Sequence, residues 1–278
     1  MKELKAASAT MQPAKQFSPG VIDYNGRMSA SYQDGRSLSS EAASTWVAIV
    51  APFVRRRTNT RILDLGAGTG RFSVLFTQMV GAQVVGVEPS KGMLAVGGAG
   101  AKLKNLVYVA GSAESIPLRS QSCDLAWLSH VWHHIRDHHA CARELRRVVP
   151  RDGHVLVRGT FGNQLDGFPT LFRFWPATRK ICQQLPTIQQ TVQVFEANGF
   201  VLTEHRRVQQ TTCASLGEFA KRTQARADTA LALISDAEFH EGQATLEEAA
   251  ARERTSGPVI ETIELLVFRD QTTLATAC

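Results

Sequence analysis

The sequence has few cysteines and no long apolar run. Its 278 residues include five cysteines, and none of them forms a CxxC pair, which argues against a zinc ribbon or a disulfide framework. No stretch reaches the roughly eighteen apolar residues that a membrane span needs, and the N-terminus has no apolar segment typical of a signal peptide. We therefore expect reduced thiols, no membrane partner and a cytoplasmic location.

A basic stripe is also lacking. The 31 Lys and Arg residues exceed the 25 Asp and Glu residues, for a formal net charge of +6, but they are dispersed in short groups such as Arg55–Arg57. No basic segment is interleaved with aromatic residues, which argues against a nucleic-acid partner. The apolar fraction of 44% and the absence of internal repeats favour one large α/β core, so we predict a single domain over residues 1–278.

The most informative segment is Arg61–Phe72, which reads RILDLGAGTGRF. Its first half is the apolar run of a buried parallel strand, and Gly66, Gly68 and Gly70 then allow a tight turn and a close approach to a ligand. The helix that follows directs its free N–H groups at the same space, which favours an anionic group. The segment predicts a nucleotide-type cofactor site, with an ordinary tight turn as the alternative.

A second strand, 83–87, follows a helical pattern and ends in Glu88. In Rossmann-type folds a carboxylate at this position binds ribose hydroxyls. Strand, glycine turn, helix, strand and acid together form a more specific signal than the glycine turn alone.

The rest of the chain has the rhythm of a doubly wound parallel sheet. Strands are predicted at 61–65, 83–87, 106–110, 123–128 and 154–158, and a helix that begins at Ser39 meets Pro52, which ends or kinks it. After Phe161 the rhythm breaks. A helix at 187–197 and strands at 200–208 and 259–269 follow. We assign 1–54 to an N-terminal helical lid or extension, 55–160 to a cofactor-binding core, and 161–186 and 216–254 to substrate-side insertions.

The first eighteen or so residues are polar and contain proline. Such a segment predicts either a frayed end or an arm that reaches a neighbouring subunit of a homo-oligomer.

Five motifs in order resemble those of class I S-adenosylmethionine-dependent methyltransferases. DLGAGTG (64–70) resembles the family's (E/D)xGxGxG motif, and the later matches are EPSKGML (88–94), GSAESIPL (111–118), CDLAWLSHVWHHI (123–135) and RELRRVVPRDGHVLV (143–157). The resemblance covers Arg55 to about Gly159 and is specific as a set. It implies a Rossmann-like, doubly wound, seven-stranded α/β sheet with an antiparallel last strand, and S-adenosylmethionine as cofactor, with S-adenosylhomocysteine as product.

The resemblance also implies roles for individual residues. The glycine turn would lie under the methionyl part, Glu88 would bind the ribose, and Pro89 and Met93 would border the adenine. Ser112 stands where the family usually has an acid. Asp64 either serves the site or only orders the turn. Tyr24, Tyr32 and Arg36 of the N-terminal lid would close over the cofactor, with Arg36 pairing with its carboxylate. The alternative is that they only pack on the surface. The implied cofactor set is Tyr24, Tyr32, Arg36, Asp64, Gly66, Ala67, Gly68, Glu88, Pro89, Met93, Ser112, Ala113, Glu114, Ser129 and His130.

The run HVWHHIRDHH holds five of the eight histidines. It does not match the HExxH pattern of a zinc helix, and the resembled family commonly has no metal here, so we assign no metal. His133 or His134 lies where the acceptor should sit, and a neutral imidazole there would take a proton from a hydroxyl or an amine. Imidazoles satisfied by the fold or facing solvent are the alternative.

Aromatic residues gather where the rhythm of the fold is interrupted. We predict that they line a pocket for a hydrophobic small molecule, although aromatic residues more often fill a core. Aromatic faces also stabilise a cation, such as the carbocation formed when an alkene is methylated. The predicted lining residues are Trp132, Phe161, Phe168, Phe172 and Trp175.

The favoured interpretation is methylation of a hydrophobic secondary metabolite. It takes the form of C-methylation of a prenyl or terpenoid alkene with cation-driven cyclisation, and the narrower resemblance is to C-methyltransferases of teleocidin-type indole alkaloid pathways. Two alternatives stay open. One is O- or N-methylation of a phenolic or quinone-like metabolite with a histidine base. The other is a cofactor-binding regulatory protein without turnover.

Overall fold

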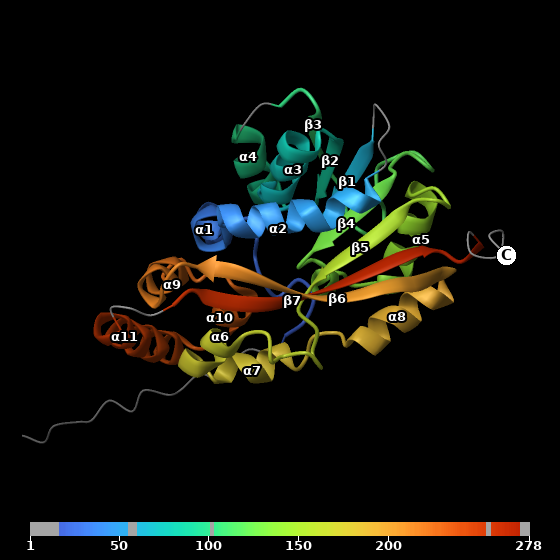
Figure 1. Cartoon of the computed structure of the whole chain (residues 1–278). Coiled ribbons are helices and arrows are strands. Elements are labelled where there is room, and N and C mark those ends of the chain that lie inside the picture. Colours follow the sequence, from blue (N-terminus) through green and yellow to red (C-terminus); the bar gives the residue numbers. More distant parts are fainter. Residues whose placement is uncertain (1–16, 55–59, 101–102, 254–256, 273–278) are drawn as a thin grey trace, which may run out of the picture.

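The sheet has seven strands in the order β3-β2-β1-β4-β5-β7-β6 (Figure 1). The structure is a computed structural model that describes residues 17–54, 60–100, 103–253 and 257–272. Strands β1 to β5 pair in parallel, whereas β7 runs antiparallel to both β5 and β6. The predicted fold class is confirmed. The strands are β1 (Arg61–Leu65), β2 (Gln83–Glu88), β3 (Leu106–Ala110), β4 (Leu125–Ser129), β5 (His154–Gly159), β6 (Phe200–Cys213) and β7 (Val259–Asp270).

Strand β6 is longer than the sequence predicted. We expected it to end at Val208, but it continues to Cys213 because β7 pairs with it as far as Val259. The added segment reads QQTTC, and two of its three buried residues, Gln210 and Thr212, are polar. A polar buried face hides the alternation by which a strand is recognised. Strand β4 also begins two residues later than the predicted Cys123.

Helices flank the sheet on both faces, and most begin with a side-chain cap. Ser39 caps α2, whose helix ends at Val50 before Pro52 enters a short 3-10 turn, as expected from the missing N–H of proline. In the part of the chain that the structure describes, no helix is long and apolar enough to cross a bilayer. The helices are α1 (Arg27–Arg36), α2 (Ser40–Val50), α3 (Arg71–Leu75), α4 (Lys91–Ala99), α5 (His138–Val148), α6 (Pro169–Phe174), α7 (Ala177–Cys182), α8 (Ile188–Ala197), α9 (Leu216–Thr223), α10 (Thr229–Leu233) and α11 (Asp236–Arg252).

Alternate residues of the central strands feed two separate cores. On β4, Leu125 and Trp127 pack with α2 and α3, whereas Ala126 and Leu128 pack with α5 and α8. This alternation leaves Arg158 of β5 on the same face as Leu125 and Trp127. That placement brings a charged side chain into the first core.

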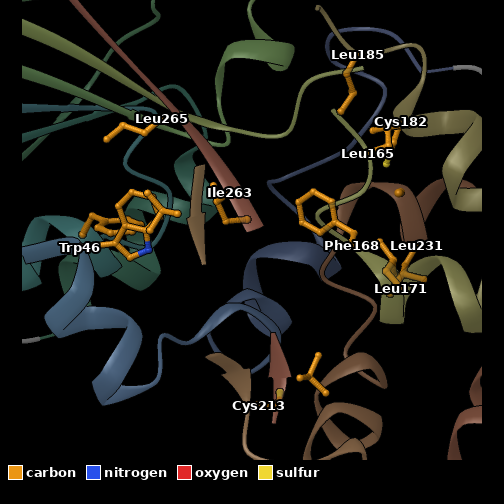
Figure 2. Close-up of a cluster of buried hydrophobic side chains, with 14 of the residues drawn as sticks. Trp46, Leu165, Phe168, Leu171, Cys182, Leu185, Cys213, Leu231, Ile263 and Leu265 are labelled. Carbon is orange, nitrogen blue, oxygen red and sulfur yellow. The ribbon is translucent and has the colours of Figure 1, made fainter. Parts of the chain in front are cut away.

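Strands β6 and β7 extend past the rest of the sheet. Strand β5 pairs with β7 only from Glu264 to Phe268, so the other end of the β6–β7 pair projects toward α9, α10 and α11 (Figure 1). Helices α6 and α7 pack against this group. Phe168, Leu171 and Leu231, from the two predicted insertions, belong to one buried apolar cluster there (Figure 2).

Candidate functional site

The glycine turn after β1 borders open space at one position. All three of its motif glycines have positive φ, and a Cβ on Gly70 would lie 1.7 Å from the hydroxyl oxygen of Tyr108. A Cβ on Gly68 would instead meet only Cε1 of Tyr32, at 3.9 Å. Packing therefore requires Gly70, whereas Gly68 faces a space that a ligand can enter.

Glu88 is fixed at the edge of this turn. It is 8% exposed, and its carboxylate accepts hydrogen bonds of 2.9 Å from the backbone N–H groups of Gly68 and Ser90. Burial raises the pKa of Glu88, and the two hydrogen bonds oppose that shift. Each carboxylate oxygen keeps a further lone pair, so Glu88 suits a ligand that offers two hydroxyl donors.

Asp64 is buried near the end of β1, before the glycine turn. Its carboxylate is 2% exposed and accepts a 2.6 Å hydrogen bond from the hydroxyl of Ser73, which ties β1 to α3. Burial raises the pKa of Asp64 to about 6 despite that bond. This bond joins Asp64 to α3, and the role of Asp64 at the cofactor site stays a prediction.

The predicted adenine side lies beyond Glu88. The segment that starts at Gly111 begins beside Glu88, because the N–H of Gly111 donates to the carbonyl oxygen of Glu88. Glu114 accepts from the N–H of Arg136 at 3.1 Å, so it already holds a backbone group. Of the other predicted residues, Met93 and Ala113 are buried, Pro89 is exposed and Ser112 is partly exposed.

The lid is tied to the core at both ends of α1. The carbonyl oxygen of Tyr24 accepts from the hydroxyl of Ser90, and the Tyr24 hydroxyl lies 2.9 Å from Nε2 of His134. At the other end, Arg36 forms a 2.9 Å ion pair with Asp228. The structure thus gives Arg36 a partner other than the cofactor carboxylate that the resemblance implied, because Asp228 caps α10 next to it.

A cavity that is partly open to solvent lies beside the lid, and we call it the lid cavity. Tyr32 is part of its wall and is also the nearest neighbour of Gly68, so the glycine turn and the cavity adjoin. Its polar wall includes Tyr24, Tyr32, Arg36, Arg71, His130, His133, His134, Arg158, Gln210, Arg222, Asp228, Thr229 and Glu261. Its apolar wall includes Phe168, Leu171, Ile181, Cys182 and Leu185.

Three histidines of the predicted run line the lid cavity. His130 follows β4 with a positive φ of 54°, which turns the chain toward the cavity. Burial is the main cause that lowers the pKa of His130 and His133 well below 6.5, and positive neighbours add to it. Burial also lowers the pKa of His134 to about 4. The three rings are therefore neutral near pH 7, and Nε2 of His134 is placed to accept a hydrogen bond from the Tyr24 hydroxyl.

Of the predicted aromatic residues, Phe168 lines the lid cavity and the other four pack elsewhere. Trp132 stacks between His138 and Phe195, with ring centroids 4.3 and 5.1 Å away. Trp175 stacks on Phe239 and donates from Nε1 to its carbonyl oxygen at 3.0 Å.

Phe161 is 1% exposed in the second core, and Phe172 packs against the first core under Arg179. These rings fill cores because large apolar surface gains most from full burial.

Apart from Arg36, the sequence did not indicate the charged and amide side chains of the cavity, such as Arg158 and Gln210. Arg158 donates to the hydroxyl of Ser129 at 3.0 Å and to the amide oxygen of Gln210 at 2.9 Å. Ser129, predicted on the methionyl side, is thus a partner of an arginine. One signal was visible in the sequence. Arg158 lies near the end of the mostly apolar strand HVLVRG, and a buried arginine needs polar partners.

Among the residues that the structure describes, no three His, Cys, Asp or Glu side chains are grouped so that they would hold a metal ion. The described cysteines, Cys123, Cys141, Cys182 and Cys213, are buried and free.

The fold and the adjoining glycine turn define the class of protein. Residues 63–157 match the family profile of the methyltransferase domain. This part of the chain is therefore similar to a methyltransferase domain, as the motifs indicated.

Curated relatives match part of the chain, among them the following two methyltransferases. An uncharacterized methyltransferase of Bacillus subtilis, YcgJ, is 34% identical over 104 residues, which are 36% of this chain and 41% of the relative. The demethylmenaquinone methyltransferase of Thermobifida fusca is 33% identical over 125 residues, 44% of this chain and 52% of the relative. The chain thus spans about half the length of the curated relatives it matches.

A solved structure extends the likeness to the whole fold. A putative methyltransferase from an antibiotic biosynthesis pathway of Anabaena variabilis superposes with a TM-score of 0.62, and the match covers 81% of this chain and 96% of that one. At 16% identity this likeness concerns the fold.

Proposed function

We propose that the protein transfers the methyl group of S-adenosylmethionine to a hydrophobic small molecule with an ionisable hydroxyl, such as a phenol or a reduced quinone. The cofactor, when bound, supplies a methyl carbon that is already activated by its sulfonium. The chain then has to hold the two reactants together, exclude water and accept the proton of the acceptor. The name of the Thermobifida fusca relative, which indicates a quinone precursor as substrate, supports this acceptor class.

The cofactor fits the residues at the glycine turn. The open side of Gly68 admits the ligand, and the carboxylate of Glu88 is held at the turn with lone pairs left for ribose hydroxyls. The match of residues 63–157 to the methyltransferase domain supports the same cofactor.

The observation that carries the proposed chemistry is the contact between Tyr24 and His134. Their side chains are 2.9 Å apart on the wall of the lid cavity, and burial keeps His134 neutral. A neutral imidazole accepts a proton from a hydroxyl placed against it, directly or through the tyrosine. The nearby guanidinium groups also favour the oxyanion that forms.

Methylation of a prenyl alkene is the second candidate. The apolar wall, with Phe168, Leu171 and Leu185, suits an isoprenoid chain. That reaction forms a carbocation, however, and the cationic arginines that line the same cavity disfavour it. We therefore rank it below the hydroxyl acceptor.

Turnover with matched acceptors tests the function. We expect S-adenosylhomocysteine, measured by mass spectrometry, and a methylated product from 4-octylphenol but not from 4-octylanisole, which has no proton to give up. Turnover with geranyl acetate alone would favour the alkene reaction. Cofactor binding without turnover of any acceptor would support a regulatory protein.

EDTA should leave the rate of turnover unchanged, because the described residues offer no group of three metal ligands.

Removal of the Glu88 carboxylate should weaken cofactor binding. We expect Glu88→Ala to cost about 1–3 kcal/mol in S-adenosylmethionine affinity, the range for lost hydrogen bonds to a buried charged group. Isothermal titration calorimetry measures the change. Glu41→Ala, at an exposed carboxylate on α2, is the matched control and should bind normally. Equal affinity in wild type and Glu88→Ala would remove Glu88 from the site.

A further inference from the structure

The lid cavity has more positive than negative charge. Four guanidinium groups line it, from Arg36, Arg71, Arg158 and Arg222, against the two carboxylates of Asp228 and Glu261. The three histidines of the wall are neutral, so they do not change this balance. An excess of buried positive charge is costly unless an anion compensates it.

Hydrogen bonds to neutral groups hold three of the four arginines. Within the described residues, only Arg36 has a carboxylate partner, Asp228 at 2.9 Å. Arg222 donates to the carbonyl oxygens of Gly35 and Thr212, and Arg71 donates to that of Arg36. Such bonds orient a guanidinium without neutralising its charge.

Arg158 is the most deeply buried of the four. It is 2% exposed, and its guanidinium carbon lies 4.4 Å from the ring centroid of Trp46. Its Nε has no hydrogen-bond partner among the residues that the structure describes. An N–H donor that is buried and unpartnered beside a cavity is suited to a ligand acceptor.

Arg71 and Arg158 flank the same aromatic ring. Their guanidinium carbons lie 5.2 and 5.3 Å from the ring centroid of Phe72. Arg71 comes directly after the glycine turn and Arg158 lies near the end of β5, so the two reach the cavity from different elements. Guanidinium groups bind carboxylate and phosphate oxygens through paired N–H donors.

The cofactor does not account for this charge. S-adenosylmethionine has one carboxylate, but it also carries an ammonium and a sulfonium, so its binding adds positive charge. An anionic group on the other ligand of the cavity would compensate this charge.

We propose that the acceptor carries a permanent oxyanion, a carboxylate or a phosphate, which binds at Arg71 and Arg158 while its hydrophobic body lies against Phe168 and Leu171. This inference rests on the proposed function, because only a methyltransferase has a methyl acceptor. The binding site itself is tested without turnover.

Matched eight-carbon probes test the oxyanion site by calorimetry on the full-length protein. We expect octanoate or octyl phosphate to bind roughly ten- to a hundredfold more tightly than octanol, the gain typical of charge-assisted hydrogen bonds. The two anions distinguish a carboxylate from a phosphate. Octylamine should not bind.

Two arginine variants test whether Arg71 and Arg158 cause the tighter binding of the anions. Arg158→Met and Arg71→Met should each reduce it to less than threefold, with circular dichroism as the check on folding. Arg119→Met removes the same charge at a site away from the cavity wall and should retain the full preference. Equal binding of octanoate and octanol to wild type would overturn the proposal. So would variants that lose S-adenosylmethionine affinity but keep the preference, since the arginines would then serve the cofactor. Neither result bears on methyl transfer itself, which the turnover assay tests separately.

Discussion

Replacement of His134 by alanine is expected to lower kcat by about two to four powers of ten, the usual contribution of a positioned acid–base group. Tyr24→Phe should lower it less, because the phenol only shares the proton with the imidazole Nε2, 2.9 Å away. Single-turnover measurements with saturating cofactor isolate the chemical step. His240→Ala, at an exposed histidine on α11, is the control and should leave kcat unchanged.

The pH profile separates His134 from an ordinary imidazole. Burial lowers its pKa from 6.5 to about 4, so the neutral, proton-accepting form persists through pH 5. We expect kcat to stay level from about pH 8 to about pH 5.5 and to fall only below it. A fall centred near the ordinary imidazole value, or full activity in His134→Ala, would place the base elsewhere.

Folding must be followed across the same profile. His130, His133 and His134 all have lowered pKa values in the folded chain, so the unfolded chain binds more protons once the pH drops below about 6.5. The free energy of unfolding therefore decreases as the pH falls through that range. Circular dichroism at each pH distinguishes this loss of fold from a loss of chemistry.

Substitution of Gly68 by valine is expected to weaken S-adenosylmethionine binding by at least a hundredfold, or about 2.7 kcal/mol. The side chain would fill the open space beside Tyr32, and a β-branched residue at the φ of 57° is strained. Calorimetric titration measures the affinity.

Gly81→Val is the control for backbone strain. Gly81 has a φ of 70°, and no atom lies within 4 Å of the position that a Cβ would take there, so it shares the strain without any ligand nearby. We expect both variants to lose similar stability and only Gly68→Val to lose the cofactor. Parallel losses of affinity would show that strain, not obstruction, is responsible.

The cofactor side of the site could be predicted because its signals are local in sequence. A strand, a glycine turn and an acid at the end of the next strand lie within Arg61–Glu88, and their hydrogen bonds join residues of that same segment. The seven strands were predicted from signals of the same kind, and the resemblance implied the sheet with an antiparallel last strand. Local patterns specify local geometry well.

The acceptor side could not be predicted in the same way. Arg158 meets Gln210 across 52 residues, and Arg36 meets Asp228 across 192. Periodicity cannot pair such residues. It also cannot tell a ring that lines a cavity from one that fills a core, so Phe168 and Trp175 looked alike in sequence although only Phe168 is on the cavity wall.

The position of the lid has a consequence for the order in which ligands bind. Tyr32 is both the neighbour of Gly68 and part of the cavity wall, and Tyr24 and Arg36 tie the same segment to Thr229 and Asp228. Donor and acceptor would therefore pass the same helix, and occupancy by one changes the free energy of admitting the other. In steady-state kinetics this geometry favours a compulsory order of substrate addition over a random one.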